Sequence, residues 1–258
     1  PKVGLNFLGI HQYTYQPYLD YEVNGVHPRS GKLESSDTKV WGFGNISVCD
    51  FEVGREFFDG CIWGAKIMLN AKTPYDRYRL GQDVMARSLA LAHQVGLITA
   101  FGFEPLTQDP EFQKLATTEE GLRQVIEARM RAAVHTFKDI DALWLFVDES
   151  AGEKAGEIDK SLAAFKFAQQ KLKELAPSKT LLLGGWGVEE PLKNATDLGD
   201  SVLTSYGIYD PWLTVKEDRV GQLAGSSRPF AIAAWCEFDG RVLMGNQANV
   251  TAYEKLVE

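Results

Sequence analysis

The feature that most constrains the fold is the alternation of short apolar runs with amphipathic helical patterns from about residue 80 onward. The apolar runs that we expect to form strands lie at 97–103, 143–147, 180–183, 201–205 and 230–234. The helical patterns lie at about 79–95, from Thr117 to Phe137, and at about 158–175. Strands that alternate with helices pair in parallel through crossover connections. This part of the chain therefore predicts an α/β fold built on a parallel sheet.

The first third of the chain is harder to interpret. We expect a strand at Val3–Ile10, ending at His11, and a second strand at Cys61–Leu69. Residues 12–60 between them are too long for a simple connection, which indicates a functional loop or an insertion. The count of about seven strand units predicts a (β/α)8-type TIM barrel, either incomplete or with an irregular second unit. We expect a single domain over residues 1–258.

The structural alternative is an open doubly wound sheet. Such sheets usually carry a Gly-rich phosphate loop after the first strand. The corresponding segment here, Gly9 to Tyr13, has no such motif, so nucleotide binding is disfavoured.

Composition excludes several classes of partner. The net charge of −8 argues against nucleic acid or an anionic membrane surface. No apolar stretch approaches the roughly 18 residues that a membrane span needs. Three Cys residues, an odd and sparse set, do not form a disulfide framework. The chain starts at Pro1, so we expect it to be processed, trimmed or a fragment, and the missing signal peptide is uninformative. We expect a secreted or periplasmic location.

Acidic residues close two of the expected strands, at Asp148-Glu149 and at Glu104. The carboxyl ends of parallel strands meet at one edge of the sheet, where barrel enzymes have their active sites. An acid beside apolar strand residues tends to be desolvated, which suits a general acid. The alternatives are that Asp148 or Glu149 caps the next helix, and that Glu104 begins an ordinary loop. Pro105 restricts Glu104 to an extended backbone.

A third acid, Glu237, follows the run that starts at Phe230. It could attack an anomeric carbon or activate a water molecule. The alternative is a solvated residue beside the turn signal Asp239-Gly240. Two converging carboxylates are the minimum that glycosidic cleavage requires.

His11 closes the first expected strand. A lone His is more often structural than a ligand, and no second His follows it in a His-x-His pattern. We therefore expect no zinc site of the usual His-rich kind and no cofactor. A carboxylate-only Mg²⁺ or Ca²⁺ site is left open.

Aromatic residues gather at or just beyond the expected strand ends. They are Trp186, Tyr206, Tyr209, Trp212 and Trp235. Sugar rings pack their apolar C–H faces on aromatic rings, while polar neighbours bind the hydroxyl groups. We assign substrate binding to His11, Asp148, Trp186, Tyr206, Tyr209, Trp235 and Asp239, with core packing as the alternative for the aromatics.

In this layout the chain resembles the (β/α)-barrel glycoside hydrolases of the large retaining clan. The resemblance implies that an acid/base Glu ends the fourth strand and a nucleophilic Glu ends the seventh, here Glu149 and Glu237. The clan's usual Asn-Glu pair is Asp148-Glu149 in this chain. The segments Phe101–Pro105 and Trp235–Gly240 also look like those of bacterial polysaccharide-degrading barrels related to α-glucuronidases and agarases.

The leading hypothesis is a glycoside hydrolase acting on a polysaccharide or oligosaccharide. Glu149 would protonate the leaving oxygen, Glu237 would act as nucleophile or base, and Glu104 would assist or bind the sugar. The alternatives are a non-catalytic carbohydrate-binding protein and a carboxylate-metal enzyme.

Overall fold

The computed structural model describes residues 6–13, 16, 18–28, 72–147, 156–185, 188–205 and 227–232. Its strands are β1 (Phe7–Gln12), β2 (Ile98–Phe103), β3 (Ala142–Val147), β4 (Thr180–Gly185), β5 (Val202–Ser205) and β6 (Phe230–Ile232). Its helices are α1 (Pro74–Gln94), α2 (Glu119–Thr136), α3 (Glu157–Leu175) and α4 (Glu189–Asn194), with a 3₁₀ turn at Leu115–Thr117.

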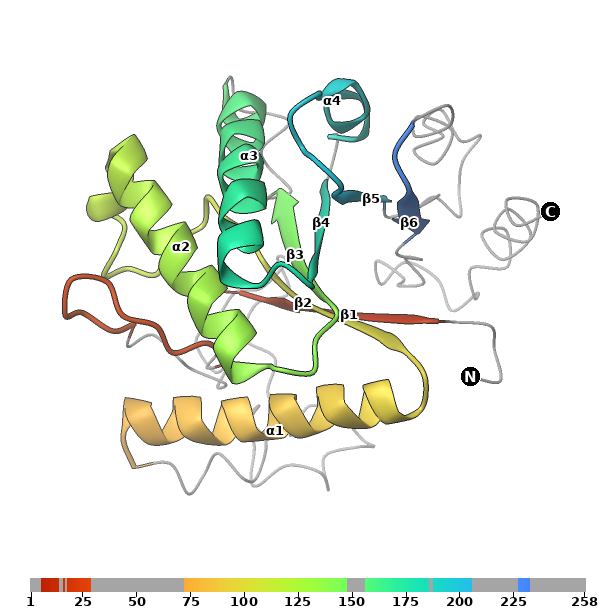
Figure 1. Cartoon of the computed structure of the whole chain (residues 1–258). Coiled ribbons are helices and arrows are strands. Elements are labelled where there is room, and N and C mark those ends of the chain that lie inside the picture. The colour runs from red at the N-terminus through yellow and green to blue at the C-terminus, as the bar shows by residue number, and fades with distance from the viewer. Residues whose placement is uncertain are drawn as a thin grey trace, which may run out of the picture.

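The six strands form one sheet in the order β1-β2-β3-β4-β5-β6, and every neighbouring pair is parallel. The sheet is curled like half of a barrel, with the helices arranged around it (Figure 1). The α/β class expected from the sequence is confirmed, but the eight-unit TIM barrel is wrong. Apolar runs reveal strands and helices, whereas closure of a barrel depends on pairing between distant strands.

The strand count from the sequence also needs correction. β1 pairs directly with β2 in the register His11 to Gly102, so no strand from residues 61–69 lies between them. Those residues are outside the described part of the chain. Glu149 therefore follows the third strand of this sheet, not a fourth, and Glu237 follows the sixth described strand, not a seventh. The strand that precedes Glu237 still comes three places later in the strand order than the strand that precedes Glu149.

All four helices pack against one face of the sheet, which we call the helix face. Alternate strand residues such as Phe101, Leu143 and Leu183 point to this face and join the same buried cluster as Leu89 of α1 and Phe165 of α3. The strands are apolar on both faces, as expected for a parallel sheet. This core fixes the position of the strand ends.

The ends of the helices follow from local sequence. Thr73 caps α1 and forms a capping box with Asp76, and Pro74 lies in the first turn. α2 is capped by Thr118, whose side chain accepts a hydrogen bond from the Gly121 backbone N–H. The helix start expected at Thr117 is thus wrong by one residue, because Thr117 belongs to the preceding 3₁₀ turn.

The opposite face, which we call the inner face, carries a second buried cluster centred on Trp144. The Trp144 indole N–H donates to the Thr204 hydroxyl at 3.0 Å, across β4. On the other side the indole reaches Gly9 of β1, where a Cβ would lie 2.8 Å from the ring. A Cβ at Gly102 would lie 2.5 Å from the Trp144 carbonyl oxygen. Neither position has room for a side chain, Gly9 because of the indole ring and Gly102 because of the Trp144 backbone and Cβ.

Candidate active site at the carboxyl edge of the sheet

Two of the predicted site residues, Glu104 and His11, lie in the described part of the chain. The others lie outside the described residues: Asp148, Glu149, Trp186, Tyr206, Tyr209, Trp235, Glu237 and Asp239. Because the strands are parallel and neighbours in chain order, the segments that leave them start from one edge of the sheet, the carboxyl edge. Glu104 follows Phe103 directly at this edge, and Asp148 is the next residue in the sequence after Val147.

Glu104 is a buried carboxylic acid with an exposed fraction of 7 %. It comes directly after Phe103, the last residue of β2. His11 is aligned with Gly102 in the parallel register, so it lies on the strand next to the one that Glu104 follows. A buried acid of this kind must be satisfied by nearby charges or hydrogen bonds.

A buried positive charge at this edge comes from Arg129, which sequence reasoning missed. Arg129 lies in α2 and is only 1 % exposed. Its Nη1 donates hydrogen bonds to the backbone carbonyls of Glu104 at 2.9 Å and Thr107 at 3.0 Å. The guanidinium carbon also lies 4.0 Å from the centre of the Phe103 ring, a cation–π geometry. Arg129 therefore ties α2 to the end of β2.

A signal for Arg129 was present in the sequence. Val125, Ile126, Met130 and Ala133 form the apolar stripe of α2, and Arg129 falls inside that stripe at helical spacing. An arginine within an apolar stripe is either buried with partners or wrongly placed, so it marks a position to examine.

Two further buried polar residues, also missed from sequence, face Arg129. The Tyr21 hydroxyl donates to the Asp109 carboxylate at 2.6 Å. Burial raises the pKa of Tyr21, so the phenol keeps its proton and remains the donor. Burial lowers the pKa of Arg129, while Tyr21, Asp109 and Glu104 act in the opposite direction. The result is a buried cluster of one cation and two carboxylates.

His11 lies within β1 rather than after it, because the strand continues to Gln12. Its ring contacts Phe146 edge to face, with centroids 5.1 Å apart. Burial, with a smaller contribution from the charge of Arg129, lowers the pKa of His11 from 6.5 to about 4. The imidazole is therefore neutral at pH 7, and one ring nitrogen can accept a hydrogen bond.

Several buried polar atoms at this edge have no hydrogen-bond partner among the described residues. They are His11 Nε2, Gln12 Oε1, Gln108 Oε1 and Arg129 Nε. Unsatisfied buried groups of this kind are uncommon in folded proteins and call for a functional or structural explanation.

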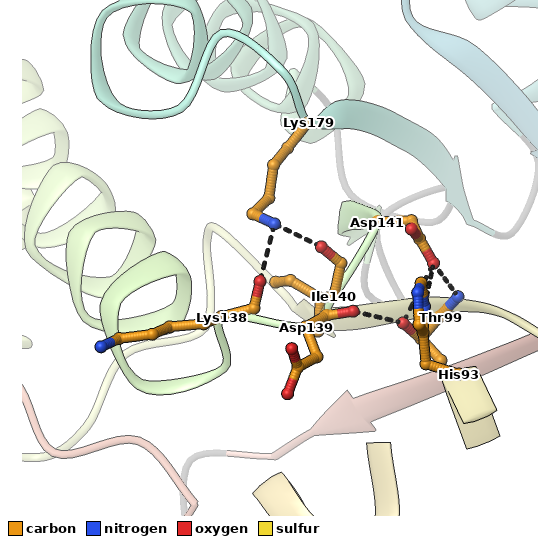
Figure 2. A network of polar contacts seen from close by, with 7 residues as sticks. All are labelled: His93, Thr99, Lys138, Asp139, Ile140, Asp141 and Lys179. Atoms are coloured by element: carbon orange, nitrogen blue, oxygen red, sulfur yellow. Dashed lines mark hydrogen bonds and ion pairs between the residues drawn. The ribbon is translucent and has the colours of Figure 1, made fainter. Parts of the chain in front are cut away.

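The opposite edge of the sheet carries a satisfied polar network (Figure 2). The Asp141 carboxylate accepts hydrogen bonds from the Thr99 backbone N–H at 2.8 Å and from its hydroxyl at 3.2 Å. His93 Nδ1 lies 3.4 Å from the same carboxylate oxygen. The Lys179 ammonium donates to the carbonyls of Lys138 and Ile140. This network joins the starts of β2, β3 and β4.

Two surface hollows flank α2. One, of about 420 Å³, lies between α2 and α3 and includes Phe167 and Arg123. The other, of about 490 Å³, lies between α2 and the segment that contains His27. Neither is lined by Glu104 or His11. Over the described residues, no three His, Cys, Asp or Glu side chains gather as metal ligands would.

None of the described helices combines the length and apolar character that crossing a membrane requires. No protein-family model matches the chain, and a search of curated proteins finds no matching sequence.

Proposed function

We propose that this protein is a glycoside hydrolase whose active site lies at the carboxyl edge of the parallel sheet. The observation that carries the proposal is the buried Glu104 at that edge, with its backbone held by Arg129. A buried acid whose backbone is held in place is the kind of group with which enzymes perform acid–base chemistry.

The sequence positions of the other acids support the same edge. Asp148 and Glu149 come directly after Val147 of β3, and Glu237 comes five residues after Ile232 of β6. In the proposed reaction, Glu149 protonates the leaving oxygen and Glu237 acts as nucleophile or as base for a water molecule. Glu104 assists them or binds a sugar hydroxyl.

The test is hydrolysis of a panel of plant, algal and host polysaccharides. Its measurement is the release of reducing ends. We expect Glu149→Gln to reduce turnover by at least about 100-fold, because the proton donor is lost. The matched control is Glu111→Gln, since Glu111 is an exposed acid in the loop after Glu104. Undiminished turnover in Glu149→Gln would contradict the assigned role.

The same panel separates hydrolysis from binding alone. If calorimetry detects a bound oligosaccharide but no reducing ends appear, the protein is a carbohydrate-binding protein and the enzymatic proposal fails. If turnover requires an added divalent cation and is lost in chelator, a carboxylate-metal reaction replaces it.

A further inference from the structure

We propose that Arg129 is the positioning residue of this site, fixing the backbone that carries Glu104 and placing a permanent positive charge at the end of β2. The inference rests on the proposed function, since it names the group that prepares that site for reaction. Arg129 itself is assigned no contact with substrate.

The hydrogen bonds of Arg129 span the turn that follows β2. One nitrogen, Nη1, binds the carbonyl of Glu104 and the carbonyl of Thr107. Pro105, between them, limits Glu104 to an extended backbone. Together these constraints give Glu104 one backbone conformation, which is what a reacting acid needs.

The charge of Arg129 acts on groups from three other parts of the chain. Tyr21 faces it from the segment after β1, Glu104 and Asp109 face it from the loop after β2, and His11 lies on β1. A guanidinium stays protonated across the range in which enzymes work, so this charge does not switch off. It attracts the carboxylates and opposes protonation of His11.

Packing alone does not explain an arginine at this position. Arg123 and Arg131, on the same helix, are exposed and form ordinary i,i+4 ion pairs with Glu119 and Glu127. Arg129 is buried instead, where desolvating a cation is costly unless it is paired. An apolar residue would complete the stripe of α2 without that cost.

The test uses two substitutions and one control in the full chain. Arg129→Lys keeps the charge but loses the planar guanidinium fork, whereas Arg129→Met loses both. Arg131→Met removes an exposed arginine from the same helix and controls for the loss of a charge. Circular dichroism establishes that each variant is folded.

The first measurement is the NMR titration of His11. We expect His11 to titrate near its wild-type pH in Arg129→Lys and Arg131→Met. In Arg129→Met the midpoint should rise by about half a pH unit or more, because a nearby positive charge is gone. An unchanged midpoint in folded Arg129→Met overturns the electrostatic role.

The second measurement is hydrolysis of the best polysaccharide from the panel. In Arg129→Lys we expect kcat to fall by about 10-fold to 100-fold with KM within about twofold, because the acid is misplaced while the substrate still binds. Wild-type kcat in this variant overturns the positioning role. If Arg129→Met does not fold, Arg129→Lys still decides this point.

The two proposals fail in different ways. Absence of hydrolysis by the wild-type protein defeats the proposed function and, with it, the positioning role. The His11 titration then decides the electrostatic role by itself. Hydrolysis by the wild-type protein together with unaltered Arg129 variants defeats only the present inference.

Discussion

The two edges of the sheet differ in how their polar groups are hydrogen-bonded. At the amino edge, Asp141 joins Thr99 and His93 in a network whose carboxylate has several partners (Figure 2). At the carboxyl edge, buried polar atoms of His11 and Gln12 have no partner among the described residues. The amino edge uses polar groups to hold strands together, whereas the carboxyl edge keeps polar groups buried at a cost in stability.

In parallel α/β folds, the two ends of the strands have different roles. Groups at the strand starts contribute to stability, and groups at the strand ends contribute to ligand binding and chemistry. Proteins tolerate strained or unsatisfied groups mainly where function requires them. Substitutions at the two edges should therefore affect different observables, and the following predictions are ordered by expected effect.

The largest effect is expected for Glu104→Gln at the carboxyl edge. The amide keeps the size of the side chain but removes the acid, so turnover of a polysaccharide substrate should fall by about 100-fold. Because the Glu104 carboxylate is buried and acts on the charge of Arg129, its neutralisation should also lower the free energy of unfolding, by about 1–3 kcal/mol. Initial rates and urea unfolding of the variant and of Glu111→Gln provide the measurements. A large loss of stability with normal turnover would contradict a functional role for Glu104 and show that the carboxyl edge is also structural.

The next effect concerns His11 and pH. Its pKa is lowered to about 4 in the folded protein, so the unfolded chain binds the proton first as the pH falls below 6.5. Folding stability should therefore decrease between pH 6.5 and pH 4, by at most about 3 kcal/mol from this residue. His11→Gln should lose this component. The measurement is the free energy of unfolding of wild type and His11→Gln, taken from denaturant unfolding at several pH values in that window. If the two free energies change with pH in parallel, the prediction is refuted.

The smallest effect is expected at the amino edge. Asp141→Ala leaves the backbone N–H of the fully buried Thr99 without its acceptor, which should cost about 2 kcal/mol. Asp141→Asn keeps an acceptor oxygen and should cost less. Turnover of the folded protein should match wild type in both variants. Thermal unfolding and initial rates measure the two quantities, and a loss of turnover would show that this edge is also functional.

Much of the local structure is predictable from the sequence. The apolar runs at 97–103 and 180–183 correspond to β2 and β4, because parallel strands are apolar on both faces. The helix expected at about 158–175 is α3, Glu157–Leu175, since its apolar spacing is regular. α4, at Glu189–Asn194, was missed because a helix this short leaves no clear period.

Pairing and burial of charge were not predictable in the same way. Nothing in the run at 61–69 reveals that β1 pairs with β2 instead. Glu104 was found because it is adjacent in sequence to an apolar strand. Arg129, Tyr21 and Asp109 come from three separate segments and meet only in the folded chain. Their cluster depends on tertiary packing, which local patterns do not encode.

The strand order has a consequence for how the chain can be assembled during synthesis. From β2 onward, each described strand pairs with the described strand that precedes it in the chain and is therefore synthesised earlier. Each new strand therefore pairs with a strand that has already been synthesised. It does not have to wait for a partner that is still to be translated. β1 differs, because its partner β2 comes only after the whole segment from Tyr13 to Leu97. Until β2 is synthesised, the backbone groups of β1 that later bond to β2 are open to pairing with other chains.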